Sequence, residues 1–318
     1  MPTPRWELPA PTYEKDVNRA VDIYRKAIIE ILAILSDLAT HGSVNKEITQ
    51  AQMNAVFAQL AVLLKSVDRD AENWIKQQIQ YVFTEGQAEA LYSLGEAKTL
   101  DEARAMVAAA PMSALSQATI TAMIDDTFEH LLSANDKMKK STIKMVRDIV
   151  AEQMRTKAAQ GMGRNSTRNA IVQSLTKAGL KDRWEKEGDV AIISRNGQTW
   201  KIRNYAEMVT RTKMLEAFSE GQRVQSIEMG IDLAIISSHG AKDACRHYEG
   251  QVISMNGQTE GFITYDELRK SNLIFHPNCK HRITPIRSLD VLPEAVRKKF
   301  EDGQKEAAAA FKAQKEKK

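Results

Sequence analysis

Residues 17–35 read VNRAVDIYRKAIIEILAIL, and their apolar side chains recur every three or four positions. The recurring positions are Val17, Val21, Tyr24, Ile28, Ile31, Leu32 and Leu35. This spacing places an apolar stripe along one side of a helix, so it predicts an amphipathic α-helix that ends before Gly42. The same spacing returns in four later segments, residues 48–64, 71–91, 113–132 and 139–159. We therefore expect a mainly α protein that begins with a bundle of long antiparallel helices.

The composition is that of a soluble protein. Of the 318 residues, 43% are hydrophobic, 27% are charged and 6% are aromatic, which excludes the disordered, collagen-like and membrane classes. Residues 1–11 lack the basic start and the apolar run of a signal peptide. The longest apolar stretch, residues 27–35, contains Glu30 and is too short to cross a bilayer. We expect no membrane segment, synthesis in a cytoplasm, and cysteines that are thiols or ligands.

The net charge of +4 is concentrated at the C-terminus. Residues 297–318 hold eight Lys and Arg against four Asp and Glu, which equals the whole excess, and residues 1–296 balance at 37 of each sign. A neutral body is not typical of a sequence-reading DNA-binding protein, which carries a basic face on its folded domain. The basic segment is expected to be a solvated terminal helix, with non-specific contact to nucleic-acid phosphates as an alternative.

Short elements replace the long helical pattern after Gly163. Asn196–Gly197 lies between the β-rich segments 190–194 and 199–202, which is a strong signal for a hairpin. The other expected elements are a capping box at Thr99–Glu102 with a helix to Ala109, a helix over 165–177 closed by Gly179, a helix from Asn204 to Gly230, a strand over 231–236, a turn at 255–257, a short helix opened by Thr264 and Glu267, and a strand over 282–286. The chain is thus divided into a helical bundle at 1–160, a small α+β module at 161–290, and a charged C-terminal helix or tail at 291–318.

Four of the six histidines and both cysteines fall between His239 and His281. They occur in SSHGAKDACRHYEG, residues 237–250, and in FHPNCKH, residues 275–281. Thiolate and imidazole groups are the ligands that Zn²⁺ prefers. Because alternate residues of an extended chain point to one side, each Cys-x-His pair can turn both of its side chains toward one ion.

The crowding predicts a structural zinc site that would stabilise a module with few aromatic residues. The expected ligands are Cys245, His247, Cys279 and His281, with His239 and His276 as alternates. A hydrogen-bonded cluster without metal and a Cys245–Cys279 disulfide are the two other interpretations of the same residues.

Residues 202–286 resemble the shared module of the phage minor capsid protein 2 family, which is close to the Mu-type head-morphogenesis proteins. The landmarks, in order, are NYAEMVTRTK at 204–213, Ala217 and Gly221, SSH at 237–239, His247 before GQVIS at 250–254, and NCKH at 278–281 followed by Pro285. The resemblance implies that His239, His247, Cys279 and His281 are the regular polar positions. Arg211 and Thr212 match the Arg-Thr pair of that module, and we expect Arg211 to be a buried arginine bonded to backbone carbonyls. The chain departs from the family at Ala241–Ala244, at Lys280, and at Cys245 and His276, which are not regular positions.

This resemblance implies a structural virion protein and not an enzyme. Such a protein would act in the capsid interior or at the portal vertex, after assembly in the host cytoplasm. Its partners would be the portal, capsid or scaffolding proteins, and it would assist head assembly, DNA packaging or genome delivery.

The alternative function is a metal-dependent nuclease or another nucleic-acid-processing enzyme that uses the His and Cys cluster. His276, Asn278 and His281 are similar to the histidines and asparagine of a ββα-metal nuclease. That motif needs its later ligands on a helix, whereas Pro277 and Pro285 bracket a segment that has an extended character. The sequence also lacks a G-x-S-x-G motif, a Walker loop and a dinucleotide-binding motif.

Overall fold

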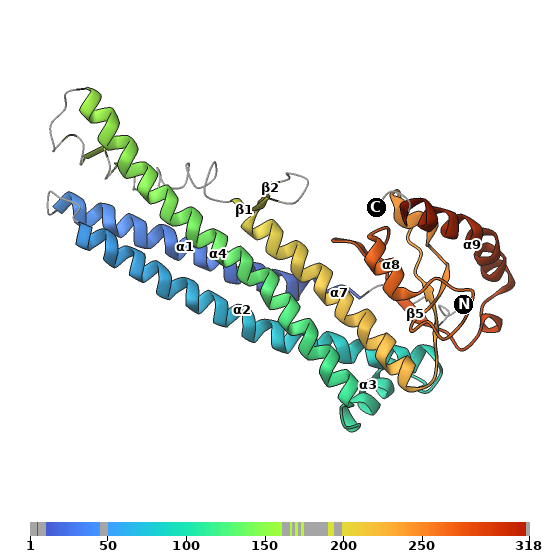
Figure 1. Ribbon diagram of the computed structural model, residues 1–318. Helices are drawn as coiled ribbons and strands as arrows, with labels where there is room; N and C mark the ends of the chain where they lie inside the picture. Colours follow the sequence, from blue (N-terminus) through green and yellow to red (C-terminus); the bar gives the residue numbers. More distant parts are fainter. Residues whose placement is uncertain are drawn as a thin grey trace. The chain divides into compact units, whose positions relative to one another are not determined.

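The computed structural model describes residues 5, 11–44, 50–160, 166, 169–170, 173–174, 190–193 and 199–315. The chain is mainly helical (Figure 1), and its C-terminal region contains a small three-stranded antiparallel sheet. This architecture confirms the predicted fold class. The helices are α1 (Glu14–Val44), α2 (Gln50–Ser93), α3 (Leu100–Ala109), α4 (Ala114–Ala159), α7 (Ile202–Glu228), α8 (Tyr265–Ser271) and α9 (Glu294–Lys315). The strands are β1 (Val190–Ile193), β2 (Thr199–Lys201), β3 (Leu233–Ile236), β4 (Val252–Ser254) and β5 (Ile283–Pro285).

The chain forms two compact units, each assembled from separate segments. The first unit contains the residues up to Glu14, Lys76–Asp126 and Arg211–Lys318, and the second contains Lys15–Ile75 and Thr127–Thr210. The predicted three-part division, at residues 160 and 290, remains a prediction.

The long helices are more continuous than the sequence pattern indicates. Helix α2 joins the predicted segments 48–64 and 71–91, and α4 joins 113–132 and 139–159. The linking residues include neither Pro nor Gly, so nothing interrupts the backbone hydrogen bonds of the helix, and two of them, Val67 and Met138, are buried. Helix α1 likewise continues through Gly42 to Val44, since one glycine costs a helix only about 1 kcal/mol.

The second unit buries the apolar stripes of its helices. The stripe of α1 includes Val17, Val21, Tyr24, Ile31 and Leu35 as predicted, whereas Ile28 and Leu32 are only half-buried. Strands β1 and β2 of this unit pair antiparallel, which confirms the two strands of the predicted hairpin. The Asn196–Gly197 turn, Gly179 and most of the predicted helix 165–177 lie outside the described residues.

Helices α2 and α7 cross in the first unit with their backbones in contact. A Cβ atom added to Gly86 would lie 2.1 Å from Phe218 O, and one added to Gly221 would lie 2.0 Å from Phe83 O. Only glycine at both positions allows so close an approach. Helix α7 begins at Ile202, directly after β2, so the prediction that Asn204 caps it is wrong.

Residues 231–315, here called the C-terminal lobe, consist of short elements within the first unit. Strand β3 is central in the sheet order β4-β3-β5 and pairs antiparallel with both neighbours. The predicted capping box at α8 is present, because Thr264 accepts from Glu267 N and Glu267 accepts from Thr264 N. At α3, Thr99 accepts from Glu102 N as predicted, but Glu102 accepts from Lys98 N instead of reaching back to the cap.

The predicted C-terminal helix is present as α9, and its first half is packed rather than solvated. Phe300 is buried and stacks on Phe262, with ring centroids 5.9 Å apart, and Ala307 is buried in the core of the lobe.

Among the described residues, no single helix has both the length and the apolar character of a membrane span. Helix α3 and residues 114–149 of α4 reach that limit only as a pair, bent by 99°.

Candidate metal centre

The first loop of the lobe carries Cys245 inward. The Asp243 carboxylate caps the 3₁₀-helix η2 (Ala244–His247) by accepting a hydrogen bond from Cys245 N at 3.0 Å. This turn directs the Cys245 side chain into the core of the lobe, where the residue is 2% exposed. Its Sγ lies 3.6 Å from Leu273 O, the acceptor of its weak S–H donor.

The second loop, between α8 and β5, carries the other cysteine. Cys279 N donates to His276 O at 2.9 Å, which closes a tight turn. Asn278 has a φ of 62°, a left-handed conformation that asparagine tolerates better than most residues. Its N–H donates to Thr212 Oγ1 on α7 at 3.1 Å, so the loop is attached to the long helix.

The two loops bring four sulfur and nitrogen atoms together. Cys245 Sγ lies 3.9 Å from Cys279 Sγ and 3.1 Å from His276 Nε2, and Cys279 Sγ lies 3.2 Å from His281 Nδ1. In a tetrahedral site with Zn–S bonds of about 2.3 Å, two sulfur atoms lie about 3.8 Å apart. The described residues therefore include a group of Cys and His side chains that could bind a metal ion.

The predicted ligands do not all join this group. Cys245, Cys279 and His281 do, and the alternate His276 belongs to a neighbouring group with Asp243 that shares Cys245, but His247 belongs to none of the candidate metal-binding groups among the described residues. His247 Nε2 instead accepts from Arg246 Nε at 3.3 Å. The expected alternation requires an extended chain, whereas residues 244–247 form a 3₁₀-helix with three residues per turn. Side chains two positions apart on such a helix point in different directions.

Glu249 is a member of the site that sequence reasoning missed. Its Oε1 lies 3.1 Å from His281 Nε2 and accepts from His239 N at 2.8 Å and from Ala241 N at 3.0 Å. The His239 ring lies against the His281 ring, with centroids 4.1 Å apart, and is itself partly exposed. The signal that could have found Glu249 is a carboxylate inside a histidine-rich segment.

Burial governs the protonation of these groups. Burial, together with the neighbouring Cys279, raises the pKa of Cys245. Burial also lowers the pKa of His281, although Glu249 opposes this effect. A neutral Cys245 thiol and a neutral His281 imidazole are thus favoured without a cation, and a bound cation would favour thiolate ligands because it replaces their protons.

This geometry does not suit a cysteine nucleophile. Cys245 contacts His276, and Asp243 Oδ2 lies 3.4 Å from the same ring, so the three residues have the composition of a catalytic triad. However, both Asp243 and Cys245 face the same nitrogen, Nε2, so the carboxylate cannot orient the ring from the opposite side as in a triad. The buried thiol with its raised pKa is also the opposite of an activated nucleophile.

The segment after His281 also differs from a ββα-metal nuclease. It continues into strand β5 and not into a helix, so His276 and His281 both lie on the loop that precedes this strand.

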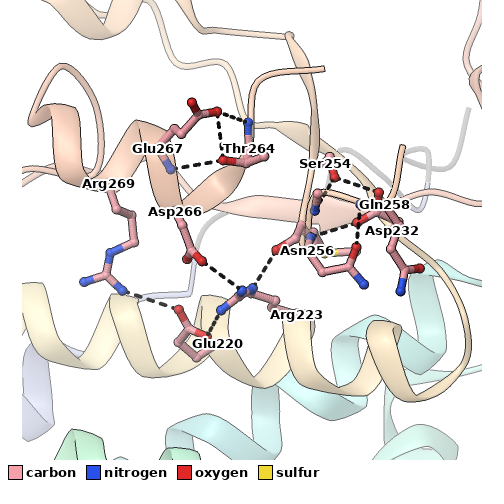
Figure 2. A network of polar contacts seen from close by, with 12 residues as sticks. Glu220, Arg223, Asp232, Ser254, Asn256, Gln258, Thr264, Asp266, Glu267 and Arg269 are labelled. Carbon is pink, nitrogen blue, oxygen red and sulfur yellow. Dashed lines mark hydrogen bonds and ion pairs between the residues drawn. The ribbon is translucent and has the colours of Figure 1, made fainter. Parts of the chain in front are cut away.

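A polar network attaches the rest of the lobe to α7 (Figure 2). Arg223 donates to Met255 O at 2.8 Å and pairs with Glu220 at 3.3 Å and Asp266 at 3.4 Å. Arg269 on α8 pairs with Glu220 at 3.4 Å and with Glu216. The network holds α8 beside α7, and therefore holds the loop that follows α8.

A buried arginine is present, but at a different position from the predicted one. Arg211 is 34% exposed and pairs with the Glu14 carboxylate at 3.0 Å, so the expectation that it is buried on backbone carbonyls is wrong. Arg282, the neighbour of His281, is 1% exposed and forms a buried ion pair with Glu89 on α2. This pair connects α2 to the residue of the lobe that directly follows His281.

A family model described as "Phage minor capsid protein 2" matches residues 10–317 of the chain. No curated protein and no solved structure matches the chain.

Proposed function

Because the chain belongs to the phage minor capsid protein 2 family, and is therefore a structural protein of the phage head, we propose that it binds the portal or the inner capsid. In that position it assists head assembly, DNA packaging or genome delivery. The observation that carries the proposal is the family match over residues 10–317, nearly the whole chain. The long helices α1, α2 and α4 offer extended faces to a portal, capsid or scaffolding protein. The function is binding and not turnover.

Co-expression with the portal, scaffolding and major capsid proteins of the same phage tests this proposal. We expect the chain to elute with one of them in size-exclusion chromatography, and to be found by mass spectrometry in purified virions in fewer copies than the major capsid protein. Absence from virions, or degradation of plasmid DNA by the purified chain with Mg²⁺ or Mn²⁺, would contradict it.

We further propose that one structural zinc ion is held by Cys245, His276, Cys279 and His281. Two thiolates and two imidazoles are a common ligand set of structural zinc, and hard cations such as Mg²⁺ avoid it. The 3.9 Å separation of the sulfur atoms supports this ligand set, in which His276 takes the place first predicted for His247.

Elemental analysis of the purified chain tests the zinc proposal. We expect about one equivalent of zinc, which Cys279→Ser abolishes and His276→Ala reduces. His247→Ala is the matched control, because it removes a nearby histidine that lies outside the ligand group. Zinc retained by Cys279→Ser, or lost in His247→Ala, would overturn this ligand set.

We also propose that the basic segment, residues 297–318, makes non-specific contact with packaged DNA. Its excess of basic residues supports this contact. Such binding weakens steeply as salt is raised, because it releases counterions. A gel-shift assay of the full chain against one truncated after residue 311, which keeps the buried Phe300 and Ala307 but removes four lysines, tests the contact, and equal binding by both proteins would contradict it.

A further inference from the structure

We propose that Glu249 is the positioning residue of the metal centre, holding His281 in the one tautomer that can bind the ion. This inference rests on the zinc site proposed above and deepens it. The observation behind it is that the His281 ring has a different partner on each of its two nitrogens. Cys279 Sγ lies 3.2 Å from His281 Nδ1, and Glu249 Oε1 lies 3.1 Å from His281 Nε2.

The first step concerns the proton on His281. Nδ1 is the nitrogen that faces the cysteines, so it must present a lone pair to the ion. The single proton of the neutral ring then resides on Nε2, where it donates to the Glu249 carboxylate. His281 is 2% exposed, so bulk water is poorly placed to serve as an alternative acceptor. A carboxylate in this position fixes both the tautomer and the orientation of the ring.

The second step concerns the carboxylate, which is itself held in place. The backbone N–H groups of His239 and Ala241 donate to the same oxygen, Oε1, at 2.8 and 3.0 Å. Gly240 between them has a φ of 75°, which lets the loop turn both N–H groups toward one atom. Burial disfavours the charged form of Glu249, but these two N–H groups and His281 lower its pKa overall. The loop therefore holds the carboxylate in a fixed position before any metal binds.

The third step separates positioning from direct ligation. His239, Glu249 and His281 could also hold a second ion. In that arrangement His281 would bridge two metal ions through its two ring nitrogens. Three hydrogen-bond donors already converge on Glu249 Oε1, so the charge on this atom is already satisfied by the protein. This arrangement favours a carboxylate that orients His281 over one that binds metal.

Zinc affinity, measured by competition with a chromophoric chelator, tests the inference in the full chain. We expect Glu249→Ala to retain one equivalent of zinc but to bind it about 10- to 100-fold more weakly, the usual effect of removing such a partner. Glu249→Gln keeps an oxygen acceptor and should lose less affinity than Glu249→Ala. In the Co²⁺-loaded protein, the visible d–d bands of Glu249→Ala should shift, because the geometry of His281 changes.

The matched control is Asp232→Asn, since Asp232 is another carboxylate of the lobe that accepts several hydrogen bonds but lies outside the cluster. It should lower stability while leaving the Co²⁺ spectrum unchanged. Unchanged zinc affinity in both Glu249 variants would overturn the positioning role and leave the zinc site standing. Two equivalents of zinc in the wild type, with one lost in Glu249→Ala, would make Glu249 a ligand. No zinc in the wild type would refute the site itself.

Discussion

The helices of the second unit and the short elements of the C-terminal lobe bury different kinds of side chain. The second unit buries aliphatic and aromatic residues at helical spacing, including Tyr24, Leu60 and Leu131. The lobe buries such residues too, but it also encloses the ionisable side chains of Asp232, His281 and Arg282, whereas the polar residues buried in the described part of the second unit, such as Asn135, are uncharged. A strand of three or four residues buries little apolar surface, so it gains less from the hydrophobic effect than a helix of 30 residues or more. The lobe therefore depends on specific polar contacts, and variants that remove those contacts test this difference.

The largest expected effect is that of metal removal. Chelation of the proposed zinc ion, or Cys279→Ser, should raise hydrogen exchange over residues 231–290 by at least about a thousandfold, which corresponds to about 4 kcal/mol. This is less than the roughly 10 kcal/mol that structural zinc contributes in small zinc domains, because the lobe also has an apolar core. Exchange in α1 should change little, because α1 is held by its apolar stripe. Hydrogen-exchange mass spectrometry measures both regions at once. An equal loss of protection in residues 231–290 and in α1 would contradict the claim that the two regions are stabilised in different ways.

Breaking the buried ion pair should come next. Arg282→Ala leaves Glu89 as an unpaired buried carboxylate and should lower the free energy of unfolding by about 3–5 kcal/mol. Burial already raises the pKa of Glu89, and Arg282 is the group that opposes this. Urea denaturation measures the loss. The double variant Glu89→Leu/Arg282→Met should recover most of it, and a double variant as unstable as Arg282→Ala would contradict this account.

Gly86→Ala tests the helix crossing, where contact is made by backbone rather than by polar side chains. The added Cβ would lie 2.1 Å from Phe218 O, so α2 and α7 must separate, at a cost of about 3 kcal/mol. Gly261→Ala is the matched control, because Gly261 has a φ of 85° but nothing within 4 Å of the added atom. It should cost only about 1 kcal/mol, for the backbone conformation. Similar thermal unfolding midpoints for the two variants would show that the crossing is not tight.

The smallest expected effect concerns Asp232, which holds the turn after β4. Its carboxylate accepts from Ser254 Oγ at 2.7 Å and from Asn256 N and Thr259 N at 2.8 Å. Burial works against the charge, but these hydrogen bonds lower the pKa of Asp232 overall. Asp232→Asn should therefore cost about 1–2 kcal/mol at neutral pH.

The pH dependence of that cost has a definite sign. Because the folded-state pKa of Asp232 is below the unfolded value of about 3.9, its contribution is fully present above that value and is lost as the pH falls through the folded pKa. The difference in unfolding free energy between wild type and Asp232→Asn should keep its full value between about pH 5 and about pH 7, and should shrink below about pH 4. A difference that grows on acidification would contradict the role of the charged carboxylate.

Local signals in the sequence predicted much of the fold. The stripe from Val17 to Leu35 predicted a helix, and the Thr264 capping box predicted the start of α8. Cys279 and His281, two residues apart on extended chain, were predicted to turn toward the same point, and they lie 3.2 Å apart. These features depend on residues only a few positions from one another, so their physics is contained within one short segment.

The membership of the site was decided by tertiary structure. His276 joins Cys245 across 31 residues and Glu249 joins His281 across 32, whereas His247 is turned away by the 3₁₀-helix that Asp243 caps. Arg282 pairs with Glu89, which is 193 residues away in the sequence. Sequence alone determined which segments are helical and which groups have the chemistry to bind a metal. Which of those groups meet depended on long-range packing, because no local spacing encodes the distance between two loops that only the folded chain brings together.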